Sequence, residues 1–446
     1  MVRAIALAVM ISAAAVAQEA PVPAPSGQRL TLEAAIQLAM QRNPDLVKQT
    51  LQRLSSEQDV VIARSQILPQ LNFNASLAET RVNGPVLVSG RTIPSLGTTS
   101  QDTTYSGNYS AGLALKQLVF DGGKWWNNLA AADLGQEANQ AQVDEQKLQI
   151  TYLVEQRFYE LLRAQRQLNV LADAAARSRD QADFTQRLFE GGRSTQADVY
   201  AARANRDNDE IQRLGEERAV ELARADLALA IGIDPSEPLA VAEPANLMAE
   251  PGQPPALREA VGRALDTRPS LKAFALSAES NRKTAAAARG DYWPSVGLFA
   301  QLNRGTQSFA TFHDRPDLNS QASAGVNISW NIFGGFATDA NARKADVQTL
   351  IAENDLASAR RNVASDVDKA VAQLVTARAQ ARVAQQSELT AKEGLRLART
   401  RQEVGVGTQL EVRDAELKLT QAQLSVVGSL VDGREAEAAL RRAQGG

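Results

Sequence analysis

Cysteine is absent from the 446 residues of the chain, and histidine occurs only once. The absence of cysteine excludes disulfides and lipid attachment at an N-terminal cysteine. The one histidine, His313, lies in the segment TFHDRPDLNS, which is typical of an exposed loop, so a zinc site or a histidine-activated nucleophile has no partners. We find no catalytic set, expect no cofactor or metal, and predict that the protein is not an enzyme.

An excess of charge of one sign is also missing. The chain has 48 basic and 51 acidic residues, so its net charge of -3 gives no reason to expect nucleic acid as a partner. Aromatic residues make up only 5% of the sequence, whereas Ala, Leu, Gln, Arg and Glu are abundant. This composition favours long helices that pack closely through small side chains.

Long apolar runs are rare as well. The short apolar run Ala4–Val16 follows Arg3 and ends at a small-x-small site before Gln18, so residues 1–17 are predicted to be a cleaved signal peptide. No other stretch approaches the ~18 consecutive apolar residues of a membrane-spanning helix. If the mature chain crosses a membrane, it must do so with strands that close into a barrel. No water is available in the lipid, so the backbone N–H and C=O groups must pair with one another.

The chain contains two copies of one structural unit, which we place at residues 18–233 and 256–446. Each copy begins with a short amphipathic helix followed by a proline, Pro44 or Pro269. The motifs LVFDGG and EGGRSTQADV of the first copy correspond to NIFGGF and EVGVGTQLEV of the second. The proline-rich stretch 234–255 between them is predicted to be a linker with little regular structure.

Alternation of apolar and polar residues predicts two strands in each copy. We expect strands at about 69–79 and 105–119 in the first copy and at about 294–304 and 321–333 in the second. The first pair is separated by a longer, loop-like insertion at 82–102. A tilted strand of this length can cross a bilayer. The apolar sides include Leu71, Phe73, Leu77, Tyr109, Leu113, Leu115, Leu298, Leu302, Val326, Ile328, Trp330 and Ile332.

A very long stretch without proline follows each strand pair, at about 123–190 and 335–403. At about 1.5 Å per residue, each helix would be about 100 Å long, which indicates a coiled coil or a helical tube. Return helices are predicted at about 195–231 and 408–442. Since these are about half as long, the helix before each strand pair is expected to stack end-on with the return helix. A coiled-coil seam is predicted at Val363, Val367, Ala370, Leu374, Ala377, Ala381 and Ala384.

Four strands per chain are too few to enclose a lumen, because known membrane barrels begin at about 8 strands. A dimer would supply eight strands and a trimer twelve. The polar side of the strands favours a wet, open lumen, so we expect a trimer as the smallest assembly with room for a channel.

The sequence resembles the TolC-type outer-membrane efflux proteins over essentially the whole mature chain. The segments that carry the resemblance are LTLEAAIQLAMQRNPDL, LPQLNF, VFDGG, GGRSTQADV, WPSVGLF, IFGGF and VGVGTQLEVRDAEL. The resemblance implies a mainly α protein with membrane β: a homotrimer whose 12-stranded barrel, surrounded by outer-membrane lipid, continues into a periplasmic α-helical tunnel. The implied location is the outer membrane of a Gram-negative bacterium, without lipidation.

The same resemblance implies a function as the exit duct of a tripartite export system. Its partners would be a periplasmic adaptor protein and an inner-membrane pump of the RND or ABC type, in multidrug efflux or in type I protein secretion. The sequence argues against two other classes of protein. A trimeric coiled-coil adhesion protein should carry its strands outside any repeat, and a passive porin needs many more strands per chain. The sequence does not indicate the cargo.

The best candidates for a functional site lie at the start of the second return helix. Glu411 and Asp414 are three residues apart and therefore share one face. Three chains would bring six carboxylates together, and the resemblance implies a periplasmic gate that favours cations. Glu411 can also be read as the capping-box partner of Thr408. In the first copy Asp198 takes the capping position, as a weaker box member than Glu411.

The tips of both helical hairpins are expected to contact the adaptor, through Gly192, Arg193, Ser194, Gly405, Val406, Gly407 and Gln409. In the family, the position matching Gly407 can hold a basic residue that links neighbouring hairpins. Glycine departs from that pattern, and a polar contact between Gln402 and Asp198 is the candidate replacement. Three tryptophans near the strand ends, Trp125, Trp126 and Trp293, are candidates for membrane-interface aromatics. Packing at the strand-to-helix junction is the alternative.

Overall fold

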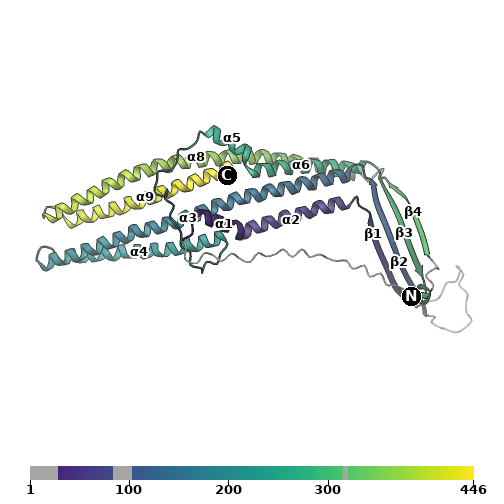
Figure 1. The fold of residues 1–446 in the computed structure, drawn as a ribbon, viewed down its shortest axis with the longest axis horizontal. Coiled ribbons are helices and arrows are strands. Elements are labelled where there is room, and N and C mark those ends of the chain that lie inside the picture. The colour runs from purple at the N-terminus through teal and green to yellow at the C-terminus, as the bar shows by residue number, and fades with distance from the viewer. Residues whose placement is uncertain (1–28, 84–102, 315–319) are drawn as a thin grey trace, which may run out of the picture.

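The computed structural model describes residues 29–83, 103–314 and 320–446. The predicted signal peptide and most of the predicted insertion at 82–102 lie outside these residues. The chain is elongated, with long helices along most of its length and a sheet at one end (Figure 1). Among the described residues, no helix is both long enough and apolar enough to cross a membrane.

Each copy follows the same element order, with a long helix of 67 residues and a return helix of 36. The first copy consists of α1 (Leu32–Arg42), α2 (Pro44–Ser65), β1 (Gln70–Asn83), β2 (Thr103–Phe120), α3 (Lys124–Glu190) and α4 (Gln196–Ile231). The second consists of α5 (Leu257–Thr267), α6 (Pro269–Arg289), a 3-10 turn (Gly290–Tyr292), β3 (Ser295–Thr306), α7 (Phe309–Asp314), β4 (Ser320–Ser329), α8 (Ala337–Glu403) and α9 (Gln409–Gln444).

Two expectations for the second copy were wrong. Strand β4 ends at Ser329, not near residue 333, because its partner β3 begins at Ser295 and Pro294 before it has no N–H to donate. The chain then turns through left-handed Gly335 and Phe336 into α8. The segment around His313 is also not purely a loop, since it contains the short helix α7.

The sheet is antiparallel in the order β1-β2-β3-β4, which leaves β1 and β4 as its edges within one chain. Its register gathers the apolar residues on one face, where Leu71 pairs with Leu115, Leu115 with Ala300 and Ala300 with Ala324. The other face carries polar residues such as Asn72, Asn74, Gln301 and Ser323. A one-residue slip in any strand would mix the two faces, so the alternation specifies the register.

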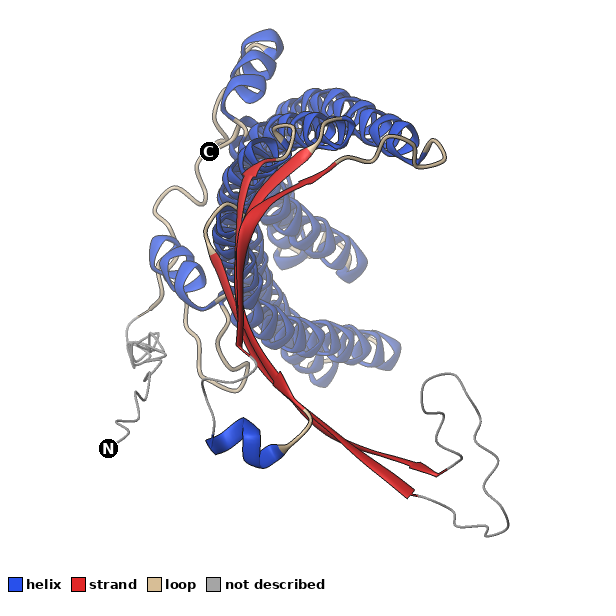
Figure 2. Cartoon of the chain, turned by 90° about the vertical axis from the view of Figure 1, so that its right-hand side faces the viewer, coloured by secondary structure: helices blue, strands red, loops and turns tan. Residues whose placement is uncertain are grey.

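The longer helices form one curved layer (Figure 2). Along α3, α4 packs on one half and α2 on the other, and α8 is covered in the same way by α9 and α6. Contacts of α3 with α6 and α9 join the two copies. The predicted seam of α8, from Val363 to Ala384, is buried at all seven positions. Figure 2 shows that the hollow side of the helical layer continues that of the curved sheet.

The predicted end-on stacking is observed at both junctions. The amide of Asn43, which precedes α2, donates to the carbonyl of Ala230 at the end of α4 with a distance of 2.9 Å. In the second copy the hydroxyl of Thr267 donates to the carbonyl of Gln444 at the end of α9. Gly232 has a φ of 84°, and a Cβ there would lie 2.6 Å from the carbonyl oxygen of Arg42. Contact this close requires glycine.

We expect Gly232→Ala to destabilise the protein by about 2 kcal/mol or more, because alanine adds left-handed strain to the clash with Arg42. Gly262→Ala is the matched control, since Gly262 lies within a helix and has open space around its Cβ position. Alanine should stabilise that helix by up to about 1 kcal/mol. Thermal unfolding followed by circular dichroism distinguishes the two, and equal melting temperatures would contradict the role of Gly232.

Candidate functional site

Two opposite faces of α9 have different partners. On one face Arg434 donates to the carbonyls of Asn246 and Ala249, and Glu437 accepts from the N–H of Gly252, which fastens the linker. In a helix, two residues that are two positions apart are rotated by about 200° about the axis, so they point to opposite sides. That other side carries a stripe of polar residues at spacings of three, four or seven, which we call the acidic stripe: Glu411, Asp414, Lys418, Gln421, Ser425, Asp432 and Glu435.

The tip end of the acidic stripe lines a groove of about 660 Å³ between α8 and α9. Glu411 and Asp414 both line it, as their spacing predicted. Lys418 lines it too, and its ammonium lies 2.6 Å from the carboxylate of Asp414. Lys418 was not among the predicted site residues, although a lysine four residues after an aspartate is a recognisable pairing pattern. Both side chains are exposed, so this pair alone contributes little stability.

At the tip between α3 and α4, Asp198 forms the predicted capping box. Its carboxylate accepts from the N–H and the hydroxyl of Thr195, at 3.0 and 2.8 Å, and from the hydroxyl of Ser194 at 3.0 Å. The Thr195 hydroxyl in turn accepts from the N–H of Asp198. The hydrogen bonds from Thr195, above all from its backbone, lower the pKa of Asp198. The side-chain bonds found for Asp198 thus come from its own turn, and a contact with Gln402 is not among those of the described residues.

At the tip between α8 and α9, the expected ranking of the two capping boxes is wrong. Thr408 accepts from the N–H of Glu411, but the Glu411 carboxylate turns toward Arg401, with a distance of 3.7 Å between the charged groups. The N-terminus of α9 is therefore capped by the Thr408 side chain alone, without the reciprocal hydrogen bond of a capping box. Because Glu411 is not engaged as a cap residue, its carboxylate remains exposed at the mouth of the groove.

The two tips turn through corresponding left-handed glycines, Gly192 and Gly405, with φ of 72° and 80°. Gly407 is needed for a different reason: a Cβ there would lie 2.9 Å from both the Cβ of Arg401 and the N of Gln402. A basic side chain at this position would require the turn to open. The glycine is therefore part of the turn's own geometry.

Three of the predicted adaptor contacts, Ser194, Gly407 and Gln409, are not fully exposed. Gln409 is half-buried and donates to the hydroxyl of Thr185 on α3, which ties the tip of α9 to the neighbouring hairpin. Ser194 is also half-buried and is held by Asp198. Arg193 and Val406, by contrast, are exposed at the two tips. The free surface of the tips is therefore smaller than the sequence predicted.

A buried ion pair joins the two hairpins just behind the tips. Arg413 on α9 binds both carboxylate oxygens of Asp209 on α4, at 2.7 and 2.8 Å, and both side chains are largely buried. Next to it, Arg177 on α3 donates to the hydroxyl of Thr420 on α9. Burial lowers the pKa of Arg177. Sequence reasoning missed these contacts because each one joins residues from distant parts of the chain.

A second junction between the hairpins lies near the far end of the acidic stripe. Arg163 on α3 lies between Asp432 and Glu435 on α9, at 2.6 and 2.9 Å. Burial raises the pKa of Glu435 to about 7, and the charges of Asp432 and Glu160 oppose the effect of Arg163. Glu435 therefore titrates near neutral pH, unlike an ordinary glutamate.

The tryptophans at the sheet end of the long helices divide into two groups. Trp125 is only 5% exposed, and its indole donates to the carbonyl of Ala63, so its assignment to the membrane interface was wrong. It packs at the strand-to-helix junction, edge-on against Trp126. Trp126 and Trp293 are 65% and 64% exposed, and Trp330, which was predicted as an apolar strand residue, is 57% exposed.

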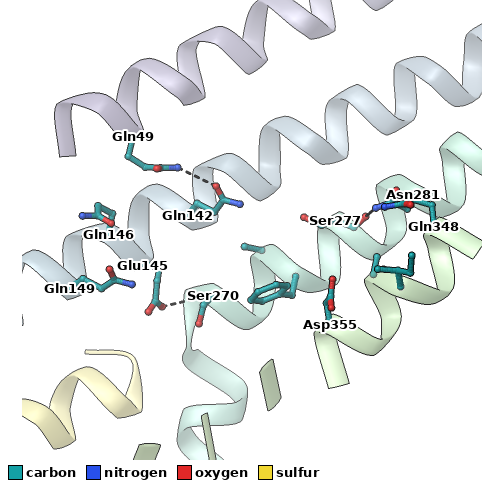
Figure 3. Close-up of a pocket in the computed structure, with 14 residues that line it drawn as sticks. Gln49, Gln142, Glu145, Gln146, Gln149, Ser270, Ser277, Asn281, Gln348 and Asp355 are labelled. Atoms are coloured by element: carbon teal, nitrogen blue, oxygen red, sulfur yellow. Dashed lines mark hydrogen bonds between the residues drawn. The ribbon is translucent and has the colours of Figure 1, made fainter. Parts of the chain in front are cut away.

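A polar groove of about 400 Å³ crosses α2, α3, α6 and α8 (Figure 3). Gln142, Gln146 and Gln149 share one face of α3, and the amide of Gln49 on α2 donates to that of Gln142 at 3.2 Å. Asp355 on α8 lines the other side. Within the described ranges no group of histidine and carboxylate side chains is arranged to hold a metal ion. The groove thus presents several hydrogen-bonding side chains.

The model of the family described as Outer membrane efflux protein matches residues 35–233 and 260–446. The chain is 25% identical over 419 residues to the outer membrane efflux protein BepC of Brucella suis, covering 93% of this chain and 85% of BepC. It is 24% identical over 413 residues to the alkaline protease secretion protein AprF of Pseudomonas aeruginosa, covering 91% and 82%.

A solved structure of CusC, described in terms of transmembrane channel formation, matches with a TM-score of 0.79 at 18% identity. The match covers 93% of this chain and 92% of that chain. At this level of identity the likeness shows a shared fold: a mainly helical chain with a small antiparallel sheet.

Glu435 should make stability depend on pH near neutrality. Its pKa is higher in the folded chain than the ordinary 4.5, so the folded state gains stability as Glu435 takes up a proton. That gain is complete below about pH 4.5 and is lost as pH rises to about 7, by up to about 3 kcal/mol. Compared with Glu435→Gln, the wild-type melting temperature should fall between pH 5 and 8.

Glu393→Gln is the control for this measurement. Glu393 is exposed, and its hydrogen bond to Arg396 lowers its pKa, so the difference from wild type should stay flat over the same range. Parallel curves for wild type and Glu435→Gln would rule out the raised pKa.

Proposed function

Because the chain belongs to the outer membrane efflux protein family, we propose that it is the outer-membrane exit duct of a tripartite export system. The family consists of transport ducts of the outer membrane and not of enzymes. The observation that carries the proposal is the sheet register: it collects apolar residues on one face and polar residues on the other, at the end of a helical layer with the same curvature. Lipid would cover the first face and water the second.

The assembly that fits this arrangement is a homotrimer. Edge strands β1 and β4 would pair between neighbouring chains and close a 12-stranded barrel, which removes every free edge. Exposed apolar side chains also form two helical bands that a neighbouring chain would cover. The first band is Leu51, Ile62, Ile211, Leu214 and Leu222 on α2 and α4, and the second is Leu350, Val375, Val383 and Leu389 on α8.

The helical layer would form a periplasmic tunnel whose hairpin tips point away from the membrane. The exposed residues Arg193 and Val406 at the tips are the proposed contacts of a periplasmic adaptor, which would connect the duct to an inner-membrane RND or ABC pump. Names of the relatives include both efflux and protease secretion, so both roles suit the chain. We also propose that residues 1–17 are cleaved as a signal peptide.

The acidic stripe would line the tunnel, and its tip end would be the gate. Glu411 and Asp414 line the same groove, and three chains would bring six carboxylates around one axis. Such a ring attracts cations and binds multivalent ones most strongly. Lys418 forms an ion pair with Asp414 within each chain and so reduces the net negative charge of the ring.

A mass measurement tests the trimer. The protein purified in detergent should have the mass of three chains by native mass spectrometry. Val383→Glu should weaken the assembly, because it places a charge in the α8 band, where Val383 is 70% exposed in one chain. Met248→Glu, at an exposed position of the linker, is the control and should leave the mass unchanged. A wild-type protein that stays monomeric would remove the basis of the barrel.

Single-channel recording tests the gate. In planar bilayers Asp414→Ala should raise conductance and weaken block by multivalent cations, because it removes three carboxylates from the ring. Asp207→Ala is the control, since Asp207 is an exposed carboxylate of α4 that lies outside the groove. If conductance and block are the same in Asp414→Ala and wild type, Asp414 has no part in the gate.

A further inference from the structure

The short helix α7 packs against the sheet through aromatic rings. Phe309 meets the ring of Tyr109 on β2 edge-on, with ring centres 5.4 Å apart, and Phe312 lies 6.5 Å from the same ring. The guanidinium of Arg304 on β3 lies over Phe312 at 5.0 Å. It also donates to the carbonyl of Thr311, at 2.9 Å. The helix is thus fixed to two strands.

These contacts place α7 on the apolar face of the sheet. Tyr109 shares its face with Leu113 and Leu115, and the register pairs Leu113 with Leu302, two residues from Arg304 on the same face. In Figure 2 the short helix lies on the convex side of the sheet, away from the hollow. The helix therefore lies outside the proposed channel and does not cover its mouth.

The helix lies where this face changes from apolar to polar. Toward the long helices the face carries Leu71, Leu113 and Leu302, all of them exposed. Around α7 lie Arg304, which pairs with Ala111, and Glu79, whose carboxylate accepts from the hydroxyl of Tyr109 at 2.9 Å. A boundary of this kind on a lipid-facing sheet marks the level of the lipid headgroups, where aromatic residues collect.

The height of the apolar face below α7 matches the thickness of the apolar band of outer-membrane proteins. From Val119, near the long helices, to Tyr109 the strand runs about 33 Å at about 3.3 Å per residue. With a tilt of about 40°, this corresponds to about 25 Å along the membrane normal, the height of the apolar band in outer-membrane proteins. Exposed Trp126 and Trp293 occupy one end of the band, and α7 occupies the other.

Among the described residues, one aromatic side chain of α7 stays largely exposed. Phe309 is 58% exposed although its ring also touches Tyr109. A bare phenylalanine in water is unfavourable, whereas at the headgroup level its ring is buried among lipid chains. The exposed side chain of Phe309 extends the apolar face of the sheet. We therefore expect the same lipid to cover both.

We propose that α7 is an interfacial anchor that docks on the outer-leaflet lipid, with Phe309 inserted at the boundary between headgroups and acyl chains. The helix fixes how deeply the sheet sits in the bilayer. This inference rests on the proposed function, because it requires the apolar face to lie in a membrane.

Because the chain has no cysteine, a single introduced cysteine is the only position that a thiol-reactive label modifies. Single-cysteine variants carrying a nitroxide are reconstituted in phosphatidylcholine–phosphatidylglycerol vesicles, and collisions with oxygen and with a water-soluble nickel chelate are measured. The anchor is probed by Phe309→Cys and by Ala310→Cys, which keeps the aromatic contacts. Leu77→Cys on the apolar face and Gln301→Cys on the polar face are the references.

Both α7 labels should collide with the nickel chelate several-fold less often than the Gln301 label, and with oxygen nearly as often as the Leu77 label. If the Leu77 label reports lipid while both α7 labels report water, the anchor is overturned and the proposed function stands. If the Leu77 label also reports water, the apolar face is not in a membrane, and the anchor fails together with the proposed function.

Discussion

The whole architecture depends on the meeting of helix ends at two junctions. Each long helix has 67 residues, about 100 Å, whereas its return helix has 36, about 54 Å. The unpaired half of each apolar seam needs another partner, and α2 or α6 supplies it only if its start abuts the end of the return helix. Asn43 and Thr267 make that meeting possible because each donates a hydrogen bond to a carbonyl that the helix end leaves free. With these partners in place, the chain can pass from helices to strands with the seam of each long helix covered along both halves.

The two copies use different chemistry at the same junction. Asn43 is a neutral cap, whose side chain also accepts from the N–H of Asp45. At the corresponding place in the second copy, Arg268 is buried and reaches Glu145 at 3.3 Å and Asp366 at 3.5 Å. The second junction thus joins α3, α6 and α8 by charge, while the first joins α4 to α2 by an amide. Duplication explains the shared geometry, and each copy solves the local hydrogen-bonding problem in its own way.

The residues that sequence reasoning placed well and those it missed differ in the range of their contacts. Periodicity depends on the neighbours along one element, so the sheet faces and the seam from Val363 to Ala384 were predictable. The direction of a side chain at a helix end depends on other elements. Gln409 is drawn to Thr185 on α3, Trp125 to the carbonyl of Ala63, and Arg413 to Asp209 on α4. The reversed ranking of Asp198 and Glu411 has the same origin, since Arg401 competes for Glu411 across the turn.

The interface between the two hairpins is polar near the tips and apolar farther away. This difference decides which end of the interface is held more weakly. Near the tips it consists of Gln409 with Thr185, Arg413 with Asp209 and Arg177 with Thr420. Farther from the tips, Val431 of α9 joins the apolar cluster that contains Phe158 and Leu227. If the hairpins separate, the polar groups regain water, which offsets much of the lost attraction, whereas exposure of the apolar cluster costs about 25 cal/mol for each Å². Separation therefore costs least at the tips, the end where the proposed gate lies.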